Sequence, residues 1–318
     1  MNCNRVLSLT LLLLACLSPL HAQETVYRVN VRLVRLLVTV KDPHGALVGD
    51  LTRDEFTVFD NGVRQEIALF EHHTAQPLSV TLLVDTSAST ASKLKEETAS
   101  LLRFLKALFA EGNPKDAVSL YSFNQDVILE TGFTRRIKRV ESELKSLKPE
   151  AGTSLYDAIF FSARALSRRD GRRVIVVVTD GADTTSVKKF HDALEAAHLA
   201  DAVLYGIMVI PVTNNPGRQI GGENALFTLS TGTGGQVFAS TLGDMLDTAF
   251  RDILRALRTQ YLIGYYPKNI PFTEERFHKV EVKVKRPDLR VITRTGYYGE
   301  QSETRSRNTG RKGPYQMR

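Results

Sequence analysis

Cysteine is nearly absent from the 318-residue sequence, and tryptophan is absent altogether. Both cysteines, Cys3 and Cys16, lie in a stretch that we interpret as an export signal, residues 1–22. Arg5 precedes a mostly apolar run there that is too short to span a membrane. With cleavage after Ala22, the mature chain has no cysteine. That excludes disulfides, cysteine nucleophiles and cysteine-based metal sites.

The signal has a second interpretation. Leu13-Leu14-Ala15-Cys16 resembles a bacterial lipobox, in which Cys16 becomes a lipidated N-terminus. A third alternative is that the segment is retained as a membrane anchor. We expect an exported protein, periplasmic or extracellular, or a lipid-anchored envelope protein if Cys16 is modified.

The sequence also lacks two common catalytic motifs, the phosphate-binding Gly-x-x-x-x-Gly-Lys-[Ser/Thr] loop and the Gly-x-Ser-x-Gly nucleophile elbow. Its formal charge of +7 is unevenly distributed, because residues 301–318 hold five basic side chains against one acidic side chain. That tail contributes +4, and its composition predicts disorder. The rest is close to balanced, so the basic charge does not indicate binding of nucleic acid.

The pattern of apolar residues divides the remaining chain into three parts. Residues 23–76 are β-rich and include a hairpin signal at Asp60-Asn61-Gly62. In residues 77–258, strands and helices alternate, which predicts a doubly wound, mostly parallel α/β sheet with helices on both faces. Residues 259–300 are β-rich again. We expect them to pack with residues 23–76, so that the α/β unit is inserted between two halves of a small β-rich domain.

One stretch organises the α/β unit. The apolar run from Val80 to Val84 predicts a strand buried on both faces, and Asp85 follows directly. Ser87 and Ser89 then place two hydroxyls on the turn. Ligands of open α/β sheets bind at the carboxyl ends of the strands. By itself the pattern is equally consistent with a plain strand-to-helix turn.

A second central run, 174–178, leads into Asp180, and Thr153 lies in a glycine-led loop before a helix. If the two strands are neighbours, both carboxylates face one crevice. Carboxylates and hydroxyls without histidine or cysteine suit Mg²⁺, and also Mn²⁺ or Ca²⁺, but not zinc.

These residues together resemble the metal-ion-dependent adhesion site of the von Willebrand factor type A (VWFA) family, which reads Asp-x-Ser-x-Ser, then Thr, then Asp. The resemblance covers about 78–258 and implies a Rossmann-like fold. It also implies that Asp85, Ser87, Ser89 and Thr153 ligate or orient the metal and that Asp180 acts through water. The flanks 51–56 and 261–266 look like those of exported bacterial proteins called VWFA-related.

The resemblance implies metal-dependent protein binding, for adhesion or assembly, with an acidic side chain of the partner completing the metal site. We expect no enzymatic activity. Two alternatives remain: a structural envelope protein whose metal only stabilises the loops, and a Mg²⁺-dependent phosphoryl-transfer enzyme with Asp85 as nucleophile. Phosphoryl-transfer sites of that kind usually carry a second Asp two residues on, where this chain has Ser87.

Overall fold

The computed structural model describes residues 33–72, 76–110, 112–209, 220–240, 244–270 and 276–299. The predicted export signal and basic tail lie outside these ranges. None of the helices within them is long and apolar enough to cross a membrane.

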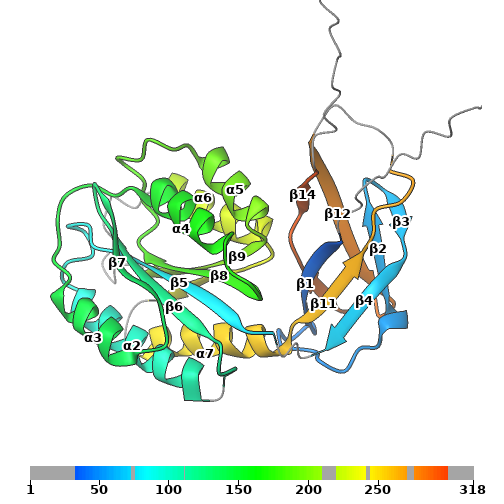
Figure 1. Ribbon diagram of the computed structural model, residues 1–318, viewed down its shortest axis with the longest axis horizontal. Helices are drawn as coiled ribbons and strands as arrows, with labels where there is room; N and C mark the ends of the chain where they lie inside the picture. The colour runs from blue at the N-terminus through cyan, green and yellow to red at the C-terminus, as the bar shows by residue number, and fades with distance from the viewer. Residues whose placement is uncertain are drawn as a thin grey trace, which may run out of the picture. The chain divides into compact units, whose positions relative to one another are not determined.

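The central element is a six-stranded sheet in the order β10-β9-β8-β5-β6-β7 (Figure 1). All neighbouring strands are parallel except β7, which runs antiparallel to β6 at one edge. The mostly parallel sheet predicted from the alternating pattern is therefore confirmed. Its strands are β5 (Leu78–Asp85), β6 (Ala117–Phe123), β7 (Val127–Thr134), β8 (Arg172–Thr179), β9 (Ala202–Val209) and β10 (Val237–Ser240).

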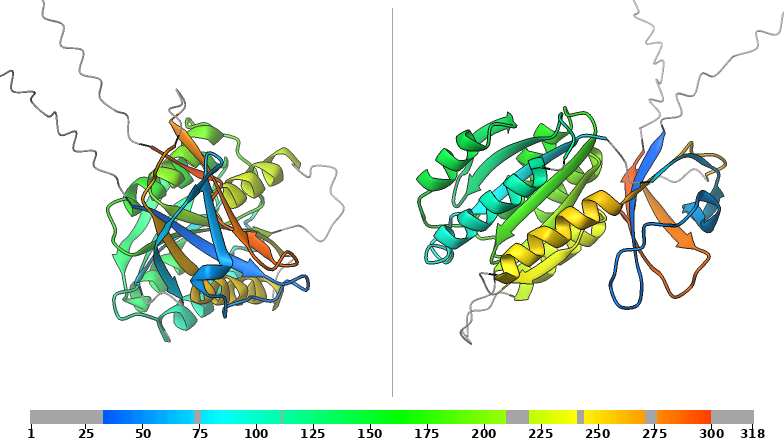
Figure 2. Two further views of the ribbon diagram at one scale, coloured as in Figure 1. Left: turned by 90° about the vertical axis from the view of Figure 1, so that its right-hand side faces the viewer. Right: turned by 90° about the horizontal axis from the view of Figure 1, so that it is seen from below.

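Helices cover both faces of this sheet (Figures 1 and 2). On one face lie α2 (Leu94–Ala110), α3 (Ile137–Ser146) and α7 (Asp244–Thr259); on the other lie α4 (Leu155–Leu166), α5 (Phe190–Leu199) and α6 (Ile220–Gly232).

Successive side chains of β5 enter two different cores. Leu82 packs with the core under α2, α3 and α7, whereas Leu83 packs with the core under α4, α5 and α6. Both are fully buried, and burial of each contributes about 1.5–3 kcal/mol. Burial on both faces is why the sequence of β5 is continuously apolar and does not alternate.

The two β-rich segments combine into two antiparallel four-stranded sheets, β13-β1-β11-β4 and β14-β12-β2-β3. The α/β unit is thus inserted between two halves of a β-rich domain, as predicted. The elements before the insertion are β1 (Val34–Lys41), η1 (Arg53–Glu55), β2 (Phe56–Asp60), β3 (Val63–Gln65) and β4 (Ile67–His72). Those after it are β11 (Tyr261–Tyr265), β12 (Phe277–Val284), β13 (Arg290–Ile292) and β14 (Gly296–Tyr298).

The hairpin between β2 and β3 turns as its sequence predicts. Asn61 and Gly62 both have positive φ, 45° and 80°, the combination that a tight two-residue hairpin requires. The last two strands of the chain belong to different sheets. β13 pairs with β1, and β14 pairs with β12. Between them the backbone N–H of Thr295 donates to the carbonyl of Gly232 in the α/β unit, so the chain leaves one sheet and enters the other.

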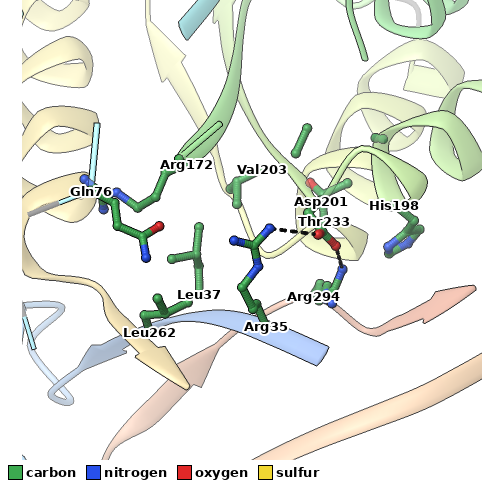
Figure 3. Close-up of a pocket in the computed structure, with 13 residues that line it drawn as sticks. Arg35, Leu37, Gln76, Arg172, His198, Asp201, Val203, Thr233, Leu262 and Arg294 are labelled. Atoms are coloured by element: carbon green, nitrogen blue, oxygen red, sulfur yellow. Dashed lines mark hydrogen bonds and ion pairs between the residues drawn. The ribbon is translucent and has the colours of Figure 1, made fainter. Parts of the chain in front are cut away.

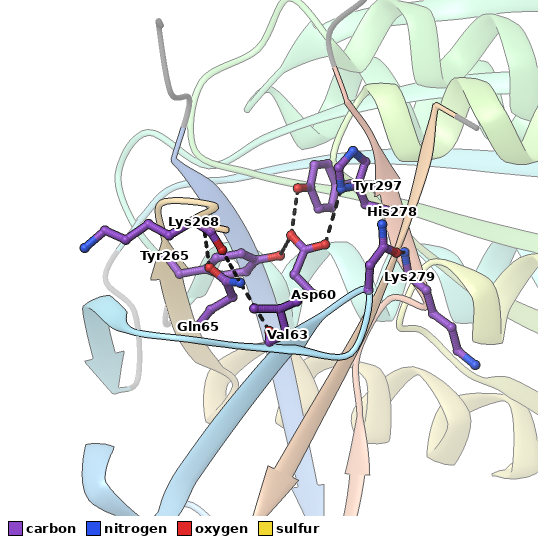
Figure 4. A network of polar contacts seen from close by, with 9 residues as sticks. Asp60, Val63, Gln65, Tyr265, Lys268, His278, Lys279 and Tyr297 are labelled. Atoms are coloured by element: carbon purple, nitrogen blue, oxygen red, sulfur yellow. Dashed lines mark hydrogen bonds and ion pairs between the residues drawn. The ribbon is translucent and has the colours of Figure 1, made fainter. Parts of the chain in front are cut away.

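A buried carboxylate joins the two halves of the β-rich domain (Figure 4). Asp60, at the end of β2, accepts hydrogen bonds of 2.8 Å from the hydroxyls of Tyr265 and Tyr297, and His278 Nδ1 lies 3.3 Å from its other oxygen. Burial, reinforced by the negative charge of Asp60, raises the pKa of both tyrosines. Both hydroxyls therefore stay protonated and keep donating to the carboxylate.

Candidate metal centre

Pairing of β5 with β8 brings the two predicted aspartates to one edge of the sheet. The strands are parallel, with Val84 opposite Val178. Strand β5 ends in Asp85, and Asp180 directly follows β8. The chain continues from β5 to β6 on one side and returns to β8 on the other, so this is the topological switch point of the sheet. Thr179 Oγ1 donates a 2.6 Å hydrogen bond to Asp85 Oδ2 and holds the end of β8 against that carboxylate.

The turn after β5 is fixed by its own hydrogen bonds. Ser87 N–H donates to Asp85 Oδ1 at 2.8 Å, and Thr90 Oγ1 donates to the carbonyls of Asp85 and Ser87 at 2.9 Å each. In this arrangement the hydroxyls of Ser87 and Ser89 are hydrogen-bonded to one another at 3.0 Å. Asp85 and Ser87 are buried, whereas Ser89 is exposed, so the turn opens outward at Ser89.

The spacing of these two hydroxyls suits a small octahedral cation. Neighbouring oxygen ligands of Mg²⁺, bonded at about 2.0–2.1 Å and at right angles, lie roughly 2.9 Å apart. Within the described ranges, no three acidic, histidine or cysteine side chains gather closely enough to hold a metal by themselves. A metal at this edge therefore depends on the hydroxyls as well as on the carboxylates.

Thr153 reaches the same edge on the loop before α4. Its N–H donates to Thr184 Oγ1 at 3.0 Å, and its carbonyl accepts from Thr184 N–H at 2.8 Å, which ties Thr153 to the loop after β8. Gly152 precedes it with φ +84°, and a Cβ there would lie 3.0 Å from Gln125 in the loop after β6. Thr153 is buried, and its hydroxyl makes no hydrogen bond to any residue that the structure describes.

Burial dominates the electrostatics of Asp85. Its side chain is 0% exposed, and loss of solvation raises its pKa to about 6. Hydrogen bonds from Ser87 and Thr179 oppose the rise, and the charge of Asp180 adds to it. A cation at this edge would favour the ionised carboxylate.

Comparison with known proteins identifies the family of the segment that contains these residues. Residues 80–182 match the family model of the von Willebrand factor type A domain. This segment is a von Willebrand factor type A (VWA) domain. A comparison with curated proteins gave no match.

Several solved structures are similar to the chain at low sequence identity. An aerotolerance-related membrane protein from Bacteroides fragilis is 19% identical, with a TM-score of 0.44 over 57% of this chain and 98% of that one. The PilB minor pilin from Streptococcus sanguinis is 13% identical, with a TM-score of 0.46 over 58% of this chain and 62% of the pilin chain. The vWF domain of the type V pili tip protein Mfa5 from Porphyromonas gingivalis is 12% identical, with a TM-score of 0.48 over 64% of this chain and 100% of the Mfa5 domain. They carry no information on what this chain binds.

The VWA domain holds one acidic residue near this edge that the sequence analysis missed. Glu97 lies on α2, is 1% exposed, and neither of its carboxyl oxygens has a hydrogen-bond partner in the described chain. Burial, followed by the charges of Asp85 and Asp180, raises its pKa to about 8. Glu97 follows Leu94 by three residues and precedes Leu101 by four, so it lies on the apolar face of the helix. An acidic residue on an apolar face was the sequence signal that could have identified it.

All five predicted metal ligands lie at the carboxyl edge of the sheet, Asp85 as the last residue of β5 and the other four in loops. Asp85, Ser87 and Ser89 share the turn after β5, Asp180 follows the neighbouring β8, and Thr153 is hydrogen-bonded to the loop after β8. The fold thus explains why residues so far apart in sequence converge. Binding of a metal by them stays a prediction.

Proposed function

We propose that the chain is an exported module that binds a protein partner through a divalent cation, Mg²⁺ above all, at the carboxyl edge of the VWA sheet. The observation that supports it most is the pair of hydroxyls on Ser87 and Ser89, held 3.0 Å apart beside a buried carboxylate. That is a set of hard oxygen donors with the spacing of neighbouring octahedral ligands.

The residues divide the work of holding the cation. Asp85 supplies negative charge, Ser87, Ser89 and Thr153 supply neutral oxygens, and Asp180 acts through water, as the resemblance to the adhesion site implies. When bound, the cation offers its remaining coordination positions to an oxygen donor of another molecule. Ser89 is the exposed member of the set, so a partner would approach the cation from the side of Ser89.

An acidic side chain of a partner protein suits those positions. The two aspartates just balance the charge of a divalent cation if both act directly, and fall short of it if Asp180 acts through water. A carboxylate then completes the charge as well as the coordination. In an interface that excludes water, such a contact concentrates binding energy in one place.

Binding fits this site better than catalysis. Asp85 is fully buried and accepts a hydrogen bond on each carboxyl oxygen, from Ser87 and Thr179, which disfavours its attack on a phosphoryl group. The exported location follows from the sequence pattern of residues 1–22.

Calorimetric titration of Mg²⁺ and Mn²⁺ tests the metal site. We expect Asp85→Ala to abolish binding, because it removes the buried charge at the centre of the set. Asp54→Ala is the matched control, since that aspartate is exposed and lies outside the VWA domain. Equal metal affinity in Asp85→Ala and the control would end the assignment.

Capture of partners from envelope extract, with and without chelator, tests the bridging role. We expect capture to need the cation and to fail for Asp85→Ala. Capture that ignores chelator while titration still shows metal binding would favour the structural alternative, in which the cation only stabilises the loops. Turnover of generic phosphate esters that disappears in Asp85→Ala would favour the phosphoryl-transfer alternative.

A further inference from the structure

A second charged centre lies at the opposite end of β8, in a cavity between the VWA domain and the β-rich strands (Figure 3). Its volume is about 40 Å³, and it is lined by Arg35, Leu37, Arg172, Asp201 and Arg294 among others. A single water needs about 10–15 Å³ on this scale, so the cavity accommodates a few waters or one small ion.

Positive charge exceeds negative charge around this cavity. Asp201 Oδ1 lies 2.6 Å from Arg294 Nη1, and its other oxygen lies 3.6 Å from Arg35 Nη2 and 3.9 Å from Arg173 Nη1. One carboxylate therefore serves three guanidinium groups. Figure 3 shows Arg35 and Arg294 converging on it from the β-rich side.

Arg172 supplies a fourth guanidinium group, which forms no ion pair with Asp201 in the described structure. It is 5% exposed, and its Nη1 donates to the carbonyl of Leu257 and, at 3.5 Å, to Gln260 Oε1. It makes no ion pair with a described residue, and its Nε has no partner among them. Burial lowers its pKa to about 10, which still leaves it charged at neutral pH. A buried charge held only by neutral acceptors is unfavourable without a counter-ion.

Neighbouring groups do not cancel this excess. The Nε of Arg294 also lacks a partner within the described ranges. Burial, and then the charge of Arg294, lowers the pKa of His198 to about 4, so this lining residue is neutral at neutral pH. Asp116 acts on Arg172 only from a distance and forms no ion pair in the part of the chain described.

We infer that this cavity binds a small oxyanion, a phosphate or a carboxylate. Guanidinium groups present N–H donors in a planar fork that matches either anion, and a volume of about 40 Å³ suits an anion of that size. The site is separate from the metal centre, because Arg172 begins β8 and Thr179 ends it, roughly 23 Å apart at the rise of a strand. Arg35 and Arg294 come from β-rich segments and Arg172 from the VWA domain, so the anion would join them.

Titration of the full chain with sodium phosphate and, separately, sodium acetate tests this inference. Chelator and about 0.15 M NaCl are present throughout, so that neither metal nor ionic strength contributes. We expect saturable binding of at least one anion with one site per chain. The anion that binds identifies the chemistry as phosphate or carboxylate.

Arg35→Gln is the main variant, because its side chain is partly exposed and Asp201 keeps Arg294 as a partner. We expect it to bind at least about tenfold more weakly. Arg255→Gln is the control, an arginine that is 72% exposed on α7 and pairs with Asp252. We expect wild-type affinity from it.

Arg172→Met is the second variant. It should lose anion binding yet melt at or above the wild-type temperature in anion-free buffer, because it removes a buried charge without a counter-ion. No saturable binding in wild type would overturn the inference. So would wild-type affinity in both Arg35→Gln and Arg172→Met.

Discussion

The buried carboxyl of Glu97 makes the stability of the metal-free protein fall as pH rises. In the unfolded chain this carboxyl titrates at its usual pKa of 4.5, whereas in the folded protein its pKa is about 8. Between these values the folded state holds a proton that the unfolded state has lost. The stabilising contribution is complete below about pH 4.5 and is lost as pH rises through about 8.

The size of this effect follows from the difference between the two pKa values. At about 1.4 kcal/mol per pH unit, it corresponds to at most about 5 kcal/mol. Asp85, with its pKa raised to about 6, contributes in the same direction over a lower range of pH. Because the two charges interact, we expect a loss of about 3–5 kcal/mol in the free energy of unfolding between about pH 5 and pH 9.

Glu97→Gln removes the titration while keeping the shape of the side chain. At about pH 5 the wild-type carboxyl is protonated and neutral like the amide, so the two proteins should agree within about 1 kcal/mol. At about pH 9 the wild-type carboxylate is ionised in an apolar setting. The variant should then be more stable by about 3 kcal/mol or more.

Urea unfolding in chelator at several pH values measures this difference. Glu96→Gln is the matched control, because Glu96 is the exposed neighbour of Glu97 on α2, and this variant should follow the wild-type curve. Saturating Mg²⁺ should shrink the advantage of Glu97→Gln, since a cation beside Asp85 favours the ionised carboxylate. A gain of the same size at every pH would refute the argument, as would a wild-type stability that does not fall between about pH 5 and pH 9.

Three further substitutions probe the loops and the β-rich domain. Thr153→Ala should weaken capture of the partner more than calorimetric Mg²⁺ affinity, because it removes only one neutral ligand. Gly152→Ala should lower the free energy of unfolding by about 1–3 kcal/mol in urea titration, since φ is +84° and the new Cβ would lie 3.0 Å from Gln125. Asp60→Asn should cost about 1–3 kcal/mol by the same measurement, because two tyrosine hydroxyls lose a charged acceptor; an unchanged midpoint would show that water replaces it.

The fold was predictable from the sequence where local pattern and tertiary environment agree. The apolar runs of β5 and β8 lead into Asp85 and Asp180. A strand that is buried on both faces has a continuous apolar sequence, so these runs indicated central strands directly. The Asn61-Gly62 hairpin is equally local, because only residues that tolerate positive φ fit its turn.

What the sequence did not reveal depends on contacts between distant segments. The break between β13 and β14 arises where Thr295 bonds to Gly232, and nothing near residue 295 in the sequence signals that partner. Asp201 likewise meets Arg294 only because the second β-rich segment returns to the VWA domain. Periodicity placed Glu97 on the apolar face of α2, but its proximity to Asp85 requires the packing of that helix on the sheet.

The two ends of β8 carry opposite imbalances of charge, and each follows from where the strand begins or ends. At the carboxyl end, the carboxylate of Asp85 is buried and forms no ion pair with a cationic side chain of the described chain. At the amino end, Arg172 is buried with a deficit of negative charge. The ends are roughly 23 Å apart, well beyond the screening length of about 8 Å at physiological salt, so neither can neutralise the other. We therefore expect the two proposed sites, one for a cation and one for an oxyanion, to bind their ions independently.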